Sequence, residues 1–435
     1  MAPPQRPRLR ALEAFPIQQD GQRAVGLRDP ARFTDQVAVL PVPLLDIVSL
    51  FDGEHSLDEI RDIVSGRHGV ALTRAEIGAV AERLDEGGFL DSPRFAARRQ
   101  RIEAEYAACS TRPAAHAGGA YAGEPDALRL QIEGFFRSPI GPGAEAVSEA
   151  SVVSGSDLRS PQGATSVGSH GPEAGALAPL RGLLAPHIDF HRGGPTYAWA
   201  YREILRRADA DCFVILGTCH AGMPDPFAAT RKAYETPLGA ASVDRDMLEA
   251  LGRRYGHDLF ASEGAHRVEH SIEFQSVMLR WALGDRRPFT VVPVLASFLH
   301  EAVWTGAAPE ADPRVPRFVE ALAATIAASN RRVCVIGGVD LAHVGPQFGD
   351  AEPNTAAFLR DLERDDRAML DAVVAGDSAA FYDSIARDGD ARRICGLSPI
   401  YTFLRALPGA RGELLRYSQW PDPQGTVSFC AAAFA

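Results

Sequence analysis

Cysteine is scarce in this sequence, and the spacing of the few cysteines excludes a fold built on disulfides. Six occur among 435 residues, at positions 109, 212, 219, 334, 395 and 430, and no two of them form a CxxC pair. Widely separated cysteines are typical of a protein whose thiols stay reduced. Cys212, Cys334 and Cys430 lie within apolar runs, which predicts that they are small core residues.

Long apolar runs and basic clusters are also missing. A membrane-spanning helix needs roughly 18 or more apolar residues in a row, and no run here approaches that length. The first residues, MAPPQRPRLR, lack the apolar core of a signal peptide. Acidic residues outnumber basic ones by 56 to 45, and the arginines are scattered among them. These absences predict a cytoplasmic protein with no membrane anchor and no nucleic-acid partner.

The chain has enough apolar residues, 46% of the total, to form two domains. Residues 1–110 are predicted to form a small winged-helix-like domain, because LLDIVSLFDG is amphipathic and two further helices begin with capping-box spacing. In those helices Ser56 is followed by Glu59, and Thr73 by Glu76. This segment resembles the small peptide-recognition domains typified by PqqD. A helical packing module without a ligand is the alternative.

Residues 111–435 alternate between apolar runs and amphipathic segments. The runs LRGLLAP, CFVILGT, FTVVPVLAS, RVCVIGGVD and TVSFCAAAF are rich in Val, Ile and Leu, as strands covered on both faces are. The pattern predicts a three-layer αβα domain with a largely parallel or mixed sheet. Residues 138–180 interrupt it with a stretch rich in Gly, Ser, Ala and Pro, which predicts a disordered insertion.

Three of the apolar runs end in imidazoles, carboxylates or thiols. LLAPHIDFH contains His187 and Asp189 near its carboxyl end. CFVILGTCHAG contains Cys219 and His220 just after its apolar run, and RVCVIGGVDLAHVG contains Asp340 and His343. Ligands of open α/β sheets bind beyond the carboxyl ends of the strands. Strand packing alone does not call for a histidine at this place. The recurrence therefore predicts a shared site at one edge of the sheet.

A further histidine, His270, falls on the same helical face as Phe274, Val277 and Trp281 in EHSIEFQSVMLRWAL. It should point toward the sheet, with Glu269 and Glu273 available to orient its ring. A buried histidine bonded to Glu273 is the alternative. Imidazoles combined with a thiolate or carboxylate favour a late first-row metal such as Fe, Cu or Zn over Mg or Ca.

Several motifs match one family in the same order. APHIDF, ILGTCH, EHSIEFQ, VIGGVDLAHVG and RRICGLSPI resemble those of the Memo family, whose bacterial members are also called AmmeMemoRadiSam system protein B. The segment AAHAGGAYAGEPDALRLQIEGFF resembles the opening of that family, and the resemblance covers residues 112–435 apart from the insertion. It implies the fold of class III extradiol dioxygenases, which hold non-haem iron with two histidines and one carboxylate.

The resemblance also implies roles for particular residues. The metal ligands would be His187, His220 and Cys395, with Cys395 in place of the carboxylate. Asp340 and His343 match second-shell or acid/base positions, and His270 matches the histidine of the EHSIE motif. His116 matches the opening HAG, without an assigned role. This chain departs from the family's usual APHAGY, SHH and DFCHWG motifs, which predicts a different pocket shape, so no substrate is carried over from a relative.

Three functions are compatible with these residues. The first is a metal-dependent redox or oxygenase-like enzyme that uses non-haem Fe(II) or Cu, with Zn as a third candidate. The second is a non-catalytic binding or scaffold protein on a vestigial dioxygenase fold. The third is a thiol hydrolase in which Cys395 or Cys219 attacks and His343 acts as base, oriented by Asp340.

The resemblance extends to partners. The name of the bacterial system implies a radical SAM protein and a small AMMECR-type protein that act together with this chain. The N-terminal domain would add a peptide as an extra strand at its sheet edge.

Overall fold

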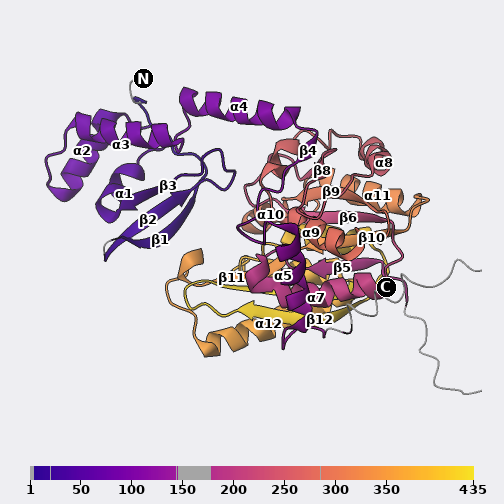
Figure 1. The fold of residues 1–435 in the computed structure, drawn as a ribbon. Helices are drawn as coiled ribbons and strands as arrows, with labels where there is room; N and C mark the ends of the chain where they lie inside the picture. Colours follow the sequence, from indigo (N-terminus) through magenta and orange to yellow (C-terminus); the bar gives the residue numbers. More distant parts are fainter. Residues whose placement is uncertain (1–3, 20, 144, 146–177, 285) are drawn as a thin grey trace, which may run out of the picture. The chain divides into compact units, whose positions relative to one another are not determined.

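The structure is a computed structural model that describes residues 4–19, 21–143, 145, 178–284 and 286–435. The chain divides into two compact units (Figure 1): Met1–Ser110 with Gly345–Pro353, and Thr111–Val344 with Asn354–Ala435. Among the described residues, no helix combines the length and apolar character needed to cross a membrane. Most of the predicted disordered insertion, residues 138–180, lies outside the described residues.

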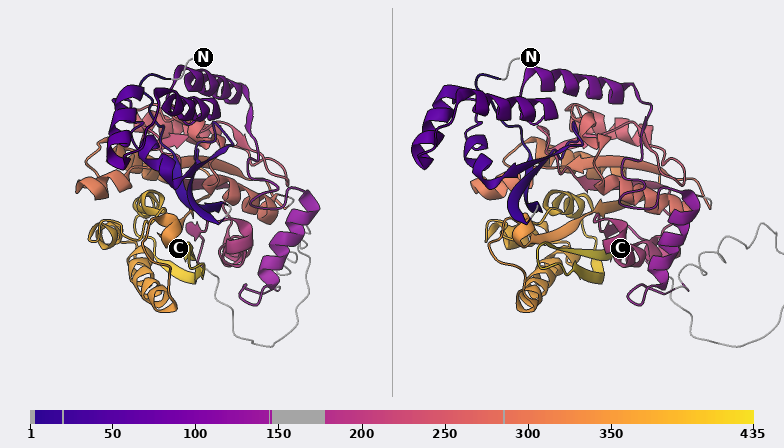
Figure 2. Two further views of the ribbon diagram at one scale, coloured as in Figure 1. Left: turned by 90° about the vertical axis from the view of Figure 1, so that its left-hand side faces the viewer. Right: turned by 60° about the vertical axis from the view of Figure 1, so that its left-hand side comes forward.

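The first unit packs helices against a small antiparallel sheet in the order β1-β2-β3 (Figure 2). Its strands are β1 (Glu13–Gln19), β2 (Gln22–Arg28) and β3 (Val37–Pro41), and its helices are α1 (Val42–Val48), α2 (Leu57–His68), α3 (Arg74–Gly87) and α4 (Pro93–Ala108), with a 3-10 turn η2 (Pro346–Phe348). Both predicted capping boxes are present, at the starts of α2 and α3. Helices α1, α2 and α3 were predicted from the sequence; α4 and the strands were not.

The second unit is built on an eight-stranded mixed sheet, which confirms the predicted fold class. Its order is β11-β13-β5-β10-β6-β9-β7, with β12 paired to β13. The four strands β5, β10, β6 and β9 run parallel, while β7, β11, β12 and β13 are antiparallel to their neighbours. The strands are β5 (Gly182–Ala185), β6 (Cys212–Thr218), β7 (Phe227–Ala229), β9 (Thr290–Ala296), β10 (Val333–Gly338), β11 (Asp340–Val344), β12 (Gly412–Trp420) and β13 (Thr426–Phe434).

Helices cover both faces of this sheet and create two apolar cores. Strand β6 shows the alternation: Phe213 and Ile215 belong to one core, and Val214 and Leu216 to the other. Helices on the first side are α5 (Pro125–Arg137), α7 (Phe190–Arg207) and α9 (Ser271–Leu283). Those on the second are α8 (Arg245–Tyr255), α10 (Leu299–Thr305), α11 (Arg314–Ala327), α12 (Ala356–Val374), α13 (Ser378–Ala386) and α14 (Leu397–Ala406). A short pair, β4 (Thr111–Arg112) and β8 (Ala233–Tyr234), and the 3-10 turn η1 (Glu263–Arg267) complete the unit.

Two glycines let the start of α9 approach the ends of the central strands. A Cβ on Gly217 of β6 would lie 2.5 Å from Ser271 Oγ, and a Cβ on Gly338 of β10 would lie 2.4 Å from the Ser271 carbonyl oxygen. The approach allows Ser271 Oγ to donate a hydrogen bond to the Thr218 carbonyl at 2.9 Å. The sheet and α9 therefore meet at the edge where the predicted site residues lie.

Gly338→Ala should lower the free energy of unfolding by about 1–3 kcal/mol, because the new methyl group overpacks against the backbone of α9. Urea denaturation of the full chain measures it. Gly252→Ala is the matched control: its Cβ would meet no atom within 4 Å, and alanine in a helix interior should stabilise by about 0.5–1 kcal/mol. Equal effects of the two substitutions would contradict the close approach.

Candidate metal centre

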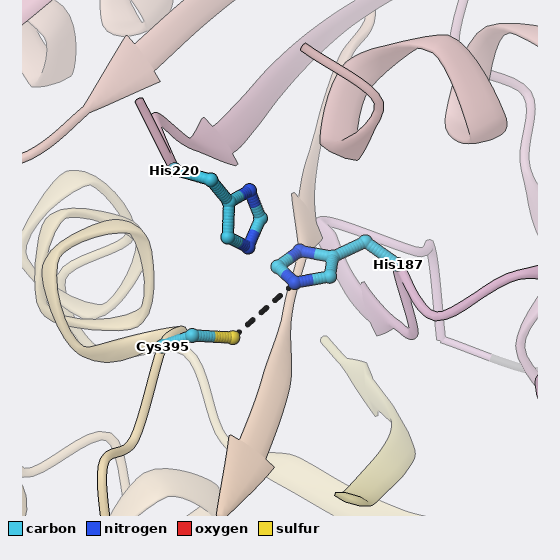
Figure 3. A group of neighbouring side chains, drawn as sticks. All are labelled: His187, His220 and Cys395. Carbon is cyan, nitrogen blue, oxygen red and sulfur yellow. Dashed lines mark hydrogen bonds between the residues drawn. The ribbon is translucent and has the colours of Figure 1, made fainter. Parts of the chain in front are cut away.

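Three side chains from separate parts of the chain converge at the carboxyl ends of the parallel strands. His187 follows β5, His220 follows β6, and Cys395 precedes α14. Their donor atoms all lie within 4.8 Å of one another, and the two rings and the sulfur face a common space (Figure 3). Atoms bound to one ion at bond lengths of ~2.0–2.3 Å lie at most about 4.5 Å apart. The three residues named from the sequence motifs thus lie close to a ligand geometry.

His187 is held as a neutral ring whose Nε2 is directed into the site. Its Nδ1 lies 2.9 Å from the Gly338 carbonyl oxygen, which only accepts, so Nδ1 carries the proton and Nε2 presents its lone pair to the site. Asp340 fixes the backbone beside it by accepting the His187 N–H at 3.0 Å. Burial, together with the nearby His220, lowers the pKa of His187 to about 3.

Glu269 orients His220 in a similar way. Its two oxygens lie 3.0 and 3.1 Å from His220 Nδ1, and it also accepts the backbone N–H of His220, His270 and Ser271. Burial opposes ionisation, but the neighbouring His220 and His270 and these hydrogen bonds hold the pKa of Glu269 well below its usual range. With its proton on Nδ1, bonded to this carboxylate, the ring of His220 would bind a metal through Nε2.

Cys395 lies on a loop that is bonded to strands of the same sheet. Its Sγ is 3.2 Å from His187 Nε2. Its N–H donates to the Leu341 carbonyl at 3.3 Å, and its own carbonyl accepts Thr218 Oγ1 at 3.0 Å. Burial and the negative charge of Asp340 raise the pKa of this thiol well above its ordinary value. Only an ion or another positive charge in the site would favour the thiolate.

Asp340 and His343 reach the site through a β-bulge. Strand β11 pairs Asp340 with Phe429 and His343 with Val427, so two residues of β11 oppose Ser428 alone. Without the extra residue, positions 340 and 343 would face opposite sides of the sheet. The Leu341 carbonyl accepts a bond from His343 Nδ1 at 3.1 Å, which fixes the tautomer that the sequence analysis had attributed to Asp340.

Burial shifts both groups toward their neutral forms. It raises the pKa of Asp340 to about 6. It lowers the pKa of His343, against the opposing effect of Asp340.

His270 lies beside the three ligands, as the residue before α9. Its ring stacks on that of His220 with centroids 4.6 Å apart, and its Nδ1 is 3.3 Å from Glu269 Oε1. His220, Glu269 and His270 form a second group with donor atoms within 4.8 Å. The Glu269 carboxylate is already occupied by three backbone N–H groups and by His220 Nδ1. It therefore serves to orient the rings.

Glu273 does not bond His270; it accepts bonds from a buried cluster that the sequence analysis missed. Arg112, with no exposed surface, pairs with Glu273 and donates to the Glu269 carbonyl at 2.7 Å. Tyr121 also donates to Glu273. His116 donates its N–H to Glu273 at 3.0 Å, and its Nε2 lies 2.8 Å from the Val268 carbonyl. The cluster holds the segment that presents Glu269, and the HAG motif was its only signal in the sequence.

The other candidate residues from the sequence, Asp189 and the remaining buried cysteines, stabilise the fold. Asp189 caps α7 by accepting the Arg192 N–H at 3.2 Å and pairs with Arg192 and His191. Cys219 is buried, and burial with the charge of Glu269 raises its pKa to about 12, which disfavours a nucleophilic thiolate. Cys212, Cys334 and Cys430 are fully buried, as predicted for core residues.

Residues 112–433 match the model of the protein family described as Memo-like protein. A MEMO1 family protein from Aquifex aeolicus is 25% identical over 425 residues, covering 97% of this chain and 98% of its own. A second, from Methanothermobacter thermautotrophicus, is 28% identical over 323 residues, covering 73% and 96%. A third, from Thermus thermophilus, is 26% identical over 362 residues, covering 83% and 93%.

Buried histidines should make the metal-free protein sensitive to acid. Burial lowers the pKa of His187 and of His266 from 6.5 to about 3. The unfolded chain therefore binds more protons than the folded one below pH 6.5, and stability is lost as pH falls from there toward about 3.

His266→Gln should reduce this loss by about 1.4 kcal/mol per pH unit, as measured by urea denaturation between pH 6.5 and 4. Exposed His257→Gln is the control and should leave the slope unchanged. Identical slopes for wild type and His266→Gln would refute the assignment.

Proposed function

Because the chain belongs to the family of Memo-like proteins, we propose that it is a cytoplasmic metal-dependent protein with redox or oxygenase-like chemistry. His187, His220 and Cys395 would hold non-haem Fe(II) or Cu. The observation that supports this most directly is the convergence of their donor atoms within 4.8 Å. The acceptors at Nδ1 of both rings strengthen it, because a ring that carries its proton on Nδ1 binds an ion through Nε2.

The donor set fits a late first-row metal. Two neutral imidazoles and one thiolate suit Fe, Cu or Zn, whereas Mg and Ca need oxygen ligands. A thiolate favours copper more than a carboxylate would. When bound, iron or copper would supply one-electron and oxygen chemistry, and zinc would supply only Lewis acidity.

The residues around the ligands would move and hold protons. His343 would move protons: burial lowers its pKa, which favours the neutral ring, and its Nδ1 lies 3.1 Å from the Leu341 carbonyl oxygen. Asp340, whose pKa burial raises to about 6, can exchange a proton near neutral pH while it holds the backbone of His187. His270 would relay protons beside the site, since its Nδ1 lies 3.3 Å from Glu269 Oε1.

Metal analysis tests the proposal. Wild-type protein purified without chelator should carry one equivalent of Fe, Cu or Zn by plasma mass spectrometry. His187→Ala, His220→Ala and Cys395→Ser should each lose most of it, whereas the exposed His257→Ala should retain it. A wild-type protein that is metal-free and cannot be reloaded would argue against the enzyme and for a binding role.

A binding role has an observation of its own, in the first unit. Strand β3 ends the order β1-β2-β3 and pairs only with β2 among the described strands. Beside it lies a groove of about 270 Å³, lined mainly by apolar side chains of β3 and α3, including Val39, Leu40, Val80 and Leu84. Val37 and Val39 are 46% and 37% exposed. An extended peptide with alternating apolar residues could add a strand to β3 and place those residues in the groove.

We propose such a peptide as the occupant of this groove, and a radical SAM protein and an AMMECR-type protein as the partners of the whole chain. Support for these partners comes from family membership. The relative from Aquifex aeolicus aligns across both units, since it covers 97% of this chain.

Val39→Asp tests the groove, because it places a carboxylate among the apolar side chains. Ten-residue peptides selected from a random library against the full chain should show alternating apolar residues. Their Kd should rise at least about tenfold for Val39→Asp, a loss of about 1.4 kcal/mol, in fluorescence anisotropy. Val70→Asp is the control, at an exposed position (46%, against 37% for Val39) that does not line the groove. Failure to select peptides, or equal Kd values for both variants, would contradict the proposal.

A further inference from the structure

A fully buried carboxylate on α12, Asp366, joins the two segments that carry Cys395 and His343. Its Oδ1 accepts Arg392 Nη1 at 2.6 Å, and its Oδ2 accepts Ser428 Oγ at 2.6 Å and the Tyr417 hydroxyl at 2.9 Å. Asp366 has no exposed surface, and the Arg392 side chain is only 13% exposed. Oδ1 thus bonds to Arg392, and Oδ2 bonds to Ser428 and Tyr417, in a different part of the chain. None of these three residues is a proposed metal ligand.

The bond from Arg392 to Asp366 Oδ1 connects Asp366 to the loop that carries Cys395. Arg392 lies three residues before Cys395, and its carbonyl accepts the His343 N–H at 2.8 Å. Arg393 returns a bond from its Nη1 to the His343 carbonyl at 3.0 Å. Fixing Arg392 therefore fixes the loop and β11 against each other.

The bond from Ser428 Oγ to Asp366 Oδ2 connects Asp366 to the β-bulge of β11. Ser428 is the single residue of β13 that opposes two residues of β11. At a bulge the extra residue is left out of the ladder of backbone bonds, and here the Ala342 N–H donates instead to Ser428 Oγ at 3.0 Å. Ser428 can accept that bond with a fixed geometry because its own proton is directed to Asp366. The bulge is what turns Asp340 and His343 toward the same site.

We propose that Asp366 is a positioning residue for the metal centre: it holds the thiol of Cys395 and the ring of His343 in register through Arg392 and Ser428. This inference rests on the proposed function for its consequence, since only a metal centre needs that register. The contacts themselves do not depend on a metal. Asp366→Asn keeps the shape of the side chain and can still accept from Ser428 and Tyr417. Its amide N–H₂, however, would face the guanidinium of Arg392, so donor meets donor.

Hydrogen exchange of the metal-free full chain, followed by mass spectrometry, tests the positioning directly. Asp366→Asn should speed exchange in residues 340–344 and 391–396. Ser428→Ala, which removes only the bond at the bulge, should speed it in 340–344 alone. Asp371→Asn is the control, an exposed aspartate on the same helix, and should change neither segment. Unchanged exchange in Asp366→Asn, or an increase spread over β6 and β9 as well, would overturn the inference.

Co(II) binding, followed by the thiolate-to-cobalt absorption, supplies the link to function. Asp366→Asn should weaken Co(II) binding about tenfold and reduce this absorption, as outer contacts of a metal site do. If the variant bound Co(II) as wild type does, with the same spectrum, the inference would fail while the proposed centre stood. If wild type bound no Co(II), the proposed centre would fail, and the exchange experiment would still decide the role of Asp366.

Discussion

The hydrogen bonds at Nδ1 of His187 and His220 determine what this site can hold. Each is made to an acceptor that belongs to the framework: the carbonyl of Gly338 for His187, and the carboxylate of Glu269 for His220. Each of these bonds keeps the ring proton on Nδ1, away from the space between the two rings and Cys395. The lone pairs of the two Nε2 atoms and the sulfur of Cys395 therefore face that space. Two imidazoles packed with ring centroids 4.8 Å apart would repel if charged. Burial and mutual proximity keep His187 neutral, which is also the form that binds a metal.

The framework that supplies these acceptors is a parallel sheet with an antiparallel extension. Strands β5, β6 and β10 end at one edge, and glycines at two of those ends admit α9 closely enough to present Glu269. Strand β13 pairs with β5 on one side and β11 on the other, and so brings the bulged strand to the same edge. The buried Arg112 adds a clamp from a point 157 residues earlier in the chain than Glu269. Distant segments are thus fixed by bonds to buried polar groups, which must be satisfied.

The strands of the second unit and part of the site could be predicted from the sequence. The strands read as apolar runs, and three of them ended in residues whose chemistry strand packing does not need, so His187 and His220 could be named before the structure. Cys395 could be named only from the family motif, because its loop follows no apolar run. The bulge at Ser428 and the clamp at Arg112 could not be predicted, since each joins residues far apart and leaves no local pattern. The bond from His343 Nδ1 to the Leu341 carbonyl joins near neighbours, but the sequence does not indicate which acceptor the ring takes. The strands of the first unit were missed because EAFPIQQ and QRAVGLR mix apolar and polar residues without a continuous apolar run, and VAVLP is only five residues long.

The burial of Cys395 has a consequence for how the centre would fill. Without a positive charge nearby, its thiol stays protonated, and a protonated thiol reacts slowly with oxidants and alkylating agents. Protein without the metal would thereby protect this sulfur. Loading then amounts to an exchange of one cation for one proton, so the occupancy of the site would follow the acidity of its surroundings as well as the supply of metal.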